Sequence, residues 1–346
     1  MGLRLIWHRV THWEYWPFKL IYYPLFPVWL FLSAKARSLF FFNAANPSMK
    51  NGGMAMESKM EIYKKIPSEY IPKTLFVKKE STLEGILSRM RQAHIEFPCF
   101  VKPDIGMKAF GVKKIISENE LAYYLKKAPA DFLVQGLIPF ENEIGIFYVR
   151  MPGEKLGKIT GMVKKEFLTI IGNGVDDIAT LIRKNPRSHL QLKTLQRSLG
   201  DQLHLILKKD EQFVLVPYGS HTRGAKFVDV THQKTPQLEG LLNTICTRID
   251  GFYYGRLDIL YNSFEELCEG RNFGIVEVNG AGSEATHVYD PKHSLFFAWR
   301  EITRHWSLLC NVSIINHKRG YPYLSYGAGR AMLKDNQAHQ AQIKMI

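Results

Sequence analysis

The order of short apolar runs and single amphipathic helices constrains the fold more than any other feature of this sequence. "DFLVQGLI" and "NEIGIFYVR" are typical of two successive strands, and "YYGRLDILYN" and "FGIVEVNG" of two more. Amphipathic stretches such as "STLEGILSRMRQAH" stand singly between these runs instead of alternating strictly with them. Paired strands with helices set apart predict an α+β fold with antiparallel sheets.

The last of these strands ends in two polar side chains that share a face. Glu277 and Asn279 are two residues apart in a strand, so both point the same way, just before a glycine-rich loop. Arg256 and Asp258 share a face in "GRLDIL" for the same reason. Asp258, Glu277 and Asn279 together supply oxygen donors, which Mg²⁺ prefers, and a neighbouring arginine is suited to neutralise charge on a transferred phosphoryl group. Loop polarity and a structural Arg–Asp pair are the plainer interpretations of each motif alone.

Lys102 and the glycines after it form a candidate phosphate-binding loop. Lys102 ends the buried run "CFVKP", where an unpaired charge is costly, and Gly106 and Gly111 let backbone amides approach an anion. An ordinary β-hairpin is the alternative. Further along, the linker between the strands of Gln135 and Glu143 offers a backbone edge for a purine and a carboxylate for a ribose, although a plain strand–loop–strand unit is the simpler interpretation.

Residues 1–50 differ in composition from the rest of the chain. Four of the six tryptophans lie in the first 29 residues, among basic side chains and a single acid, Glu14. The apolar core "LIYYPLFPVWLFLSA" has 15 residues and two prolines, and is shorter than the roughly 17–20 residues that a spanning helix needs. Trp, Tyr, Lys and Arg together are typical of a membrane interface, so we expect an in-plane or shallow re-entrant anchor facing the cytoplasm. An aromatic arm packed on the protein's own body or on a dimer partner is the alternative, and a true span is the third.

Charge and cysteine content narrow the partners and the compartment. The 346 residues carry a formal net charge of +14, which suggests an anionic partner such as a membrane surface or a phosphorylated ligand. No DNA- or RNA-binding motif is present, so we expect no nucleic acid as a partner. The four cysteines are scattered without paired spacing, which argues against a zinc site and a disulfide framework and fits a reducing compartment.

These motifs, in this order, resemble the ATP-grasp superfamily, and most closely its D-alanine–D-alanine ligase-like and cyanophycin-synthetase-like carboxylate–amine ligases. The order is a lysine-bearing helix, the "VKP" strand, a glycine-containing loop, a hinge strand, "GRLD" and "EVNG". The resemblance covers about residues 55–292. It implies an ATP-grasp fold in which two α+β subdomains, about 55–134 and 135–292, grip ATP between antiparallel sheets, followed by a C-terminal helix and tail over 293–346.

The resemblance also implies a role for each candidate site residue. The ligands of the ATP phosphates would be Lys59, Lys102 and the loop from Gly106 to Gly111. The adenine hinge would be Gln135, Leu137 and Ile138, and the ribose ligand Glu143. The ligands of Mg²⁺ or Mn²⁺ would be Asp258, Glu277 and Asn279, and the catalytic cations Arg256 and Lys102.

The segment "PYGSHTRGAKFVDVT" is similar to the region beside the acceptor site of those ligases. Arg223 is suited to bind a substrate carboxylate or phosphate, and His221 to accept a proton, with surface loop cations as the alternative. The chain departs from the family in two respects. An aromatic segment stands where a separate substrate domain is usual, and the "PG" that touches substrate in D-alanine ligases is missing after Asn279. The resemblance therefore implies the use of ATP but not a specificity for D-alanine.

The implied function is the ATP-dependent joining of a carboxylate and an amine through an acyl phosphate, with substrates that are small molecules or lipid-linked. The aromatic segment and the positive charge predict a cytoplasmic enzyme, peripheral at the inner face of a membrane, and a homodimer is compatible with the sequence. Two alternatives stay open. One is an ATP-grasp kinase that phosphorylates a small molecule or lipid, and the other is a non-catalytic, membrane-docked nucleotide-binding protein.

Overall fold

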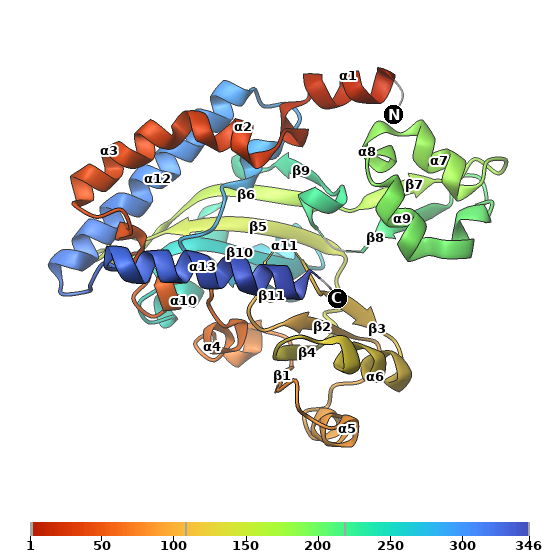
Figure 1. The fold of residues 1–346 in the computed structure, drawn as a ribbon, viewed down its shortest axis with the longest axis horizontal. Helices are drawn as coiled ribbons and strands as arrows, with labels where there is room; N and C mark the ends of the chain where they lie inside the picture. Colours follow the sequence, from red (N-terminus) through yellow and green to blue (C-terminus); the bar gives the residue numbers. More distant parts are fainter. Residues whose placement is uncertain (1–2, 108, 218, 345–346) are drawn as a thin grey trace.

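The computed structural model describes residues 3–107, 109–217 and 219–344, and these ranges contain three antiparallel sheets with helices between and around them (Figure 1). This confirms the α+β class with antiparallel sheets. The two larger sheets lie on either side of the candidate site, and the smallest belongs to a separate lobe.

The first sheet has four strands and shares its core with two helices. In spatial order its strands are β1 (Thr74–Val77), β4 (Phe132–Gly136), β2 (Cys99–Pro103) and β3 (Lys113–Ile115). The helices are α5 (Leu83–Gln92) and α6 (Glu118–Lys127). Thr82 and Ser117 cap these helices by accepting a hydrogen bond from the backbone N–H three residues on. Apolar side chains of both helices then form one core with those of the strands.

The second sheet has five strands and is buried on both faces. In spatial order its strands are β11 (Phe273–Asn279), β10 (Tyr254–Tyr261), β5 (Asn142–Val149), β6 (Lys158–Glu166) and β9 (Lys226–Asp229). The helices on its two faces are α10 (Pro236–Arg248) and α12 (Leu295–Lys318), and α11 (Phe264–Cys268) joins β10 to β11. Alternate residues of β5 divide between the two cores, Ile146 with α10 and Phe147 with α12. The middle strands are therefore firm supports for the side chains that they carry.

Helix α4 (Lys59–Tyr63) belongs to the second sheet, although it precedes the first sheet in the chain. Ile62 and Tyr63 pack in the same core as β10 and β11. This first helix of the subdomain expected over about 55–134 thus packs on the second sheet, while the backbone N–H groups of Lys59 and Met60 donate to Asp104 beside the first sheet at 3.1 and 2.9 Å. Residues 137–141 then link the two sheets.

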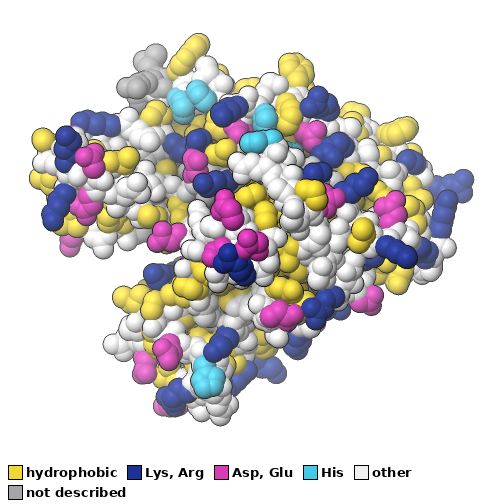
Figure 2. Space-filling view, turned by 180° about the vertical axis from the view of Figure 1, so that it is seen from behind, with side chains coloured by type: hydrophobic (Ala, Val, Ile, Leu, Met, Phe, Trp, Pro, Cys, Tyr) yellow, Lys and Arg dark blue, Asp and Glu magenta, His cyan; other side chains and the backbone are white. Residues whose placement is uncertain are grey.

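Residues 168–216 form a small lobe of their own, at the right of Figure 1. Its elements are the strand pair β7 (Leu168–Ile171) and β8 (Gln212–Val216), with α7 (Ile178–Lys184), α8 (Pro186–His189) and α9 (Leu192–Leu199). Ile178, Ile182 and Leu195 are buried in its separate core. Seen from behind, a deep notch separates this lobe from the lobe of the first sheet (Figure 2).

The N-terminal helices run along one edge of the molecule, beside α12 (Figure 1). They are α1 (Leu3–Thr11), α2 (Phe18–Tyr22) and α3 (Phe26–Ala36). Trp299 of α12 donates its Nε1–H to the carbonyl of Ile21 at 2.9 Å, and the rings of Trp29 and Trp306 meet edge to face at 5.2 Å. The inner aromatic side chains therefore pack on the protein's own body, which was the alternative to an anchor, while outer ones remain exposed. Within the described ranges, each helix is too short or too polar to cross a bilayer.

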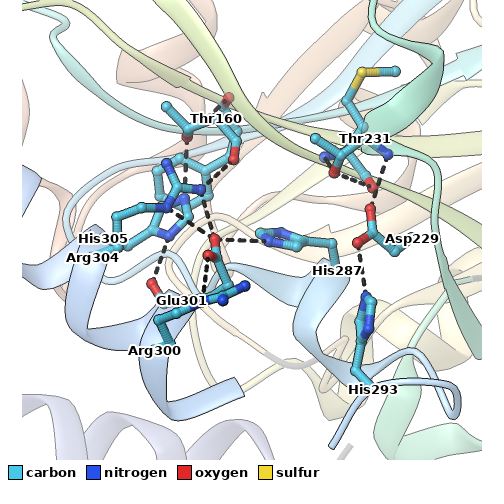
Figure 3. Close-up of polar contacts among 11 residues, drawn as sticks. Thr160, Asp229, Thr231, His287, His293, Arg300, Glu301, Arg304 and His305 are labelled. Carbon is cyan, nitrogen blue, oxygen red and sulfur yellow. Dashed lines mark hydrogen bonds and ion pairs between the residues drawn. The ribbon is translucent and has the colours of Figure 1, made fainter. Parts of the chain in front are cut away.

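A buried polar network ties α12 to the second sheet (Figure 3). Glu301 accepts hydrogen bonds from Arg304 at 2.9 and 2.6 Å and lies 3.5 Å from Nε2 of His287. His305 donates from Nδ1 to the Glu301 carbonyl at 2.9 Å, so its Nε2 is left to accept from Thr160 of β6 at 3.1 Å. Burial lowers the pKa of His305 to about 3, which keeps the ring neutral. This network fixes the loop that follows β11, and we assign it a structural role.

The chain ends in a second long helix where a tail was expected. Helix α13 (Tyr326–Ile343) runs back across the molecule towards the loop between β2 and β3 (Figure 1). Nε2 of His339 lies 2.7 Å from the carbonyl oxygen of Ile105, and Ile343 is buried beside Gly106. The predicted phosphate-binding loop therefore has a supporting helix.

Candidate functional site

A cleft of about 1120 Å³ lies between the two larger sheets and extends to the small lobe and the N-terminal segment. The predicted residues that line it are Lys59, Lys102, Gly106, Gln135, Leu137, Ile138, Glu143, His221, Arg256, Asp258, Glu277 and Asn279. Gly111 and Arg223 are not among its lining residues. The fold thus gathers into one cleft side chains that are up to 220 residues apart in the chain.

The four polar residues of β10 and β11 meet through the register of the two strands. Asp258 lies opposite Glu277, and Arg256 lies opposite Asn279. Opposite residues of an antiparallel pair project from the same face, so all four reach the cleft together. Leu257, between the two residues of β10, points the other way and is fully buried in the core.

Asp258 is held by two cations. Arg256 donates from Nε and Nη2 to the two carboxylate oxygens at 2.9 and 3.0 Å, and Nζ of Lys165 lies 3.1 Å from Oδ1. Burial alone would raise the pKa of Asp258, but these cations outweigh it and lower the pKa to about 2. The carboxylate is therefore ionised, as a metal ligand must be.

Lys165 is a residue of the site that the sequence analysis missed. Its Nζ lies 2.6 Å from Oε1 of Glu143, and its side chain is only 5% exposed. Glu143, the predicted ribose ligand, also accepts a hydrogen bond from the N–H of Gly219 at 3.0 Å. The signal was present in the sequence, because Lys165 is two residues beyond Val163 and so shares its inward face. A lysine on the apolar face of a strand needs an anionic partner.

Lys59 connects the second sheet to the glycine loop. Its Nζ lies 3.3 Å from Oε1 of Glu277 and donates to the carbonyl of Gly106 at 2.6 Å. Burial would raise the pKa of Glu277, but Lys59 and the other cations lower it. Nearby, Oε2 of Glu57 is buried without a hydrogen-bond partner among the described residues, and burial raises the pKa of that carboxyl.

Lys102 lies at the junction of the two sheets. Its ammonium donates to Oε1 of Gln135 at 2.9 Å, to the hydroxyl of Tyr63 at 2.7 Å and to the carbonyl of Val276 at 3.1 Å. Burial lowers the pKa of Lys102 to about 8, although Glu277 partly opposes this. Lys102 therefore loses its proton more easily than an ordinary lysine, which makes its charge sensitive to what binds beside it.

The donor set on β10 and β11 fits a hard cation. Asp258 and Glu277 contribute ionised carboxylates, and Asn279 contributes an amide oxygen, all on one face of the cleft. Mg²⁺ is usually bound by one or two carboxylates and completes its coordination with substrate phosphates and water. In the part of the chain that the structure describes, no group of three or more His, Cys, Asp or Glu side chains offers an alternative metal site.

His221 also lines the cleft, in an aromatic enclosure. Its ring centroid is 5.2 Å from those of Phe227 and Tyr289 and 6.3 Å from that of Tyr15, which comes from the N-terminal segment. Its Nε2 is buried and has no hydrogen-bond partner among the described residues. Burial, assisted by Arg187, lowers the pKa of His221 to about 4, so the imidazole is neutral.

Comparisons with known proteins yield distant structural likenesses alone, since no family model and no curated protein matches this chain. D-alanine–D-alanine ligase from Bacillus anthracis is 14% identical over 78% of this chain and 72% of its own, with a TM-score of 0.46. VanG D-Ala:D-Ser ligase from Enterococcus faecalis is 13% identical over 79% of this chain and 64% of its own, with a TM-score of 0.43.

A bifunctional glutathione synthetase from Pasteurella multocida is 14% identical over 69% of this chain, with a TM-score of 0.36. This chain spans about a third of that synthetase, 36% of its length, and under two thirds of the D-Ala:D-Ser ligase. Likenesses at this level do not assign an activity, so a functional argument has to rest on the side chains of the cleft.

Proposed function

We propose that this chain is an ATP-grasp ligase that joins a carboxylate to an amine and consumes ATP and Mg²⁺. The observation that carries the proposal is the convergence, at one region of the cleft, of four cations with three oxygen donors. The cations are Lys59, Lys102, Lys165 and Arg256, and the donors are Asp258, Glu277 and Asn279. Buried charges are costly, so such a cluster is more typical of a functional site than of a scaffold. The motif order that resembles the ATP-grasp superfamily supports the same conclusion.

The nucleotide would lie between the two sheets. Leu137 and Ile138 follow the end of β4 and offer an apolar wall for a base. Lys59 and Lys102 would neutralise the phosphates. Mg²⁺ held by the donors on β10 and β11 would shield the phosphate charge.

The proposed reaction has two steps. A carboxylate oxygen of the first substrate attacks the γ-phosphorus of ATP, and the bond to ADP breaks; Arg256 neutralises charge on the phosphoryl oxygens in this step. The amine then attacks the carbonyl carbon of the acyl phosphate, the bond from that carbon to the phosphate oxygen breaks, and the leaving phosphate takes up the proton that the nitrogen loses. Neutral His221 can accept a hydrogen bond from the N–H of that amine through its free Nε2. Binding would hold the reacting groups in the right geometry, so the reaction needs no covalent nucleophile from the protein.

Calorimetry of ATP binding with and without Mg²⁺ tests the nucleotide half of the proposal. We expect wild-type protein to bind ATP in a Mg²⁺-dependent manner, and Glu277→Ala combined with Asn279→Ala to lose that dependence. Glu166→Ala is the matched control, because this carboxylate is exposed and lies in a surface ion pair with Lys226. Absence of binding by folded wild-type protein would contradict the proposal.

Product analysis tests the ligase half. The His221 part of the cleft favours a second substrate, since its lining is aromatic and the buried Nε2 of His221 has no hydrogen-bond partner among the described residues. We expect ADP and phosphate to form only when both a carboxylate and an amine are supplied. A stable phosphorylated product from a single substrate would instead identify the chain as a kinase.

A further inference from the structure

The N-terminal segment forms part of the cleft wall. Tyr15, Trp16, Phe18 and Ile21 line the cleft together with His221. The segment is fixed there by specific contacts. Glu14 forms an ion pair with Arg187 of α8 at 2.5 Å, and Trp13 donates from Nε1 to the carbonyl of His293 at 2.7 Å. A substrate bound beside His221 therefore touches the aromatic segment.

This part of the cleft combines apolar walls with one buried polar atom that has no hydrogen-bond partner in the part of the chain that the structure describes. Rings of Tyr15, Phe227 and Tyr289 surround the imidazole, and the buried Nε2 of His221 can accept a hydrogen bond that no described residue donates. Leaving such an atom unpaired costs free energy, which a bound N–H or O–H would recover. The enclosure suits a polar group attached to an apolar body.

The outer face of the same segment is apolar and open to solvent. Along the upper edge of Figure 2, where α1, α2 and α3 run, hydrophobic side chains project outward. Those of residues 5–36 that are 44–71% exposed are Ile6, Trp7, Val10, Phe18, Leu20, Tyr23, Phe26, Leu30 and Phe31. Leu20, Tyr23, Phe26 and Leu30 recur every three or four residues, and we call the exposed apolar side chains of this segment the stripe.

The segments that carry the stripe and pack beneath it are rich in cations. Residues 1–50 and 292–322, which pack together, contain only two acids, Glu14 and Glu301. Both acids are buried in ion pairs with arginines. The cations of these two segments are Arg4, Arg9, Lys19, Lys35, Arg37, Lys50, Lys292, Arg300, Arg304, Lys318 and Arg319. An aromatic stripe with cations nearby, and with the only acids of these segments buried, complements an anionic lipid surface.

We propose that the outer face of α1–α3 docks on an anionic lipid bilayer and that the amine substrate is a membrane amphiphile whose polar group reaches His221. The substrate half of this inference rests on the proposed ligase function. The reason is that the stripe is continuous with the cleft. Phe18 is exposed on the stripe and also lines the cleft, so one segment faces both the lipid and the substrate beside His221. A headgroup can enter the cleft while its chain stays in the bilayer.

Vesicle flotation tests the docking half. We expect wild-type protein to float with vesicles of phosphatidylcholine and phosphatidylglycerol, less so at high salt, and not with phosphatidylcholine alone. Phe26→Ser combined with Phe31→Ser should reduce binding by roughly tenfold or more. The matched control combines Ile116→Ser with Leu156→Ser, two side chains that are each 64% exposed on other parts of the molecule. Equal binding by the two variants, or no binding by wild type, would overturn the proposal, as would a dimer in solution that buries the stripe.

Hydrogen exchange tests the substrate half on vesicles that also contain phosphatidylethanolamine, an amine-bearing lipid. We expect slower exchange both in residues 13–31 and in residues 219–227. Protection of the first segment alone would show docking without a headgroup near His221 and would overturn the substrate half. Calorimetry with ATP separates this inference from the proposed function, because the Phe26/Phe31 variant should bind ATP normally. Flotation by a protein that binds no ATP would leave docking intact and remove the ligase.

Discussion

At the residue scale, the site is built from cations that already have partners in the protein. Arg256 and Lys165 hold Asp258, and Lys59 lies beside Glu277. Such pairs keep the carboxylates ionised and the lysines ordered before any ligand arrives. The phosphates of the nucleotide would pair with the lysines and the arginine, and Mg²⁺ would pair with the carboxylates. Binding thus exchanges one set of ion pairs for another and leaves few buried charges unpaired.

Lys165 is expected to be important for stability. Lys165→Met removes the partner of Glu143 and one partner of Asp258, and breaking a buried pair costs roughly 3–5 kcal/mol. Urea unfolding measures this change in the free energy of unfolding. The control is Lys226→Met on the neighbouring strand β9, whose pair with Glu166 is about half exposed and whose loss should cost at most about 1 kcal/mol. Equal losses in the free energy of unfolding for the two substitutions would contradict the stabilising role of Lys165.

The charge of Lys102 predicts how ATP affinity depends on pH. Burial lowers the pKa of this lysine to about 8, so in the free protein it is protonated below that pH and neutral above it. Phosphates favour the protonated form, so ATP affinity should fall as pH rises through about 8, by at most about tenfold per pH unit. Calorimetry between pH 7 and 9 measures this. The Lys102→Met variant should bind ATP more weakly, and its affinity should no longer depend on pH in this range. If the affinity of the variant still falls with pH as in wild type, another group is responsible.

At the scale of elements, α13 supports the loop that would cover the phosphates. His339 meets the carbonyl of Ile105, and Nε2 of Gln340 donates to Sδ of Met107 at 3.0 Å. Ile343 is buried beside Gly106. Gly106 itself supplies no side chain for packing, so the contact has to come from Ile343. Order in this loop therefore depends on a helix more than 200 residues away in the chain.

Removing this support should loosen the loop. His339→Ala combined with Ile343→Ser takes away one hydrogen bond and one buried side chain. We expect faster hydrogen exchange in residues 104–112 and ATP binding that is weaker by several-fold, with little change elsewhere. Leu333→Ser serves as the control, because this side chain lies on the same helix and is 52% exposed. If both variants exchange like wild type, the loop is ordered by other contacts.

At the scale of the whole molecule, the N-terminal segment joins parts that are distant in the chain. Its inner aromatic side chains pack against α12, and Glu14 reaches Arg187 in the small lobe. One wall of the cleft is thus assembled from the first and the middle thirds of the sequence. The same helices present an apolar outer face, which connects the substrate end of the cleft to the surface that we propose for lipid.

The Glu14–Arg187 pair should decide whether the segment stays docked. Glu14 is 5% exposed, and burial raises the pKa of its carboxyl against the effect of Arg187. Arg187→Met leaves that carboxyl without its ionic partner, so we expect the segment to detach and trypsin to cleave after Arg9 and Lys19 several times faster. Arg183→Met, an exposed arginine in the same lobe, should cleave like wild type. Unchanged cleavage of the Arg187 variant would show that aromatic packing alone holds the segment.

The sequence predicted that Asp258, Glu277 and Asn279 lie together, because a period of two and an antiparallel pair require little of the rest of the fold, and the register of β10 and β11 brings them together; their role as metal ligands stays a prediction. It missed Lys165, although the lysine's place on the inward face of β6 was a signal, and its partners Glu143 and Asp258 became clear only once β6 lay beside β5. It also placed the segment of α4 with the first sheet, whereas Ile62 packs on the second. Such errors arise where contacts join residues that are far apart in the chain.

What the sequence alone determined is therefore local: the α+β class, the alternation of the strands, and the chemistry of each motif. Those properties follow from side-chain periodicity and from turn residues, which act over a few positions. Only the tertiary structure decided that α13 supports the glycine loop, that Lys165 completes the charge cluster, and that the aromatic segment forms a wall of the cleft. These contacts depend on the packing of segments that are far apart in the chain. Apolar burial is non-directional, so which surfaces pack together depends on the shape of the whole folded chain.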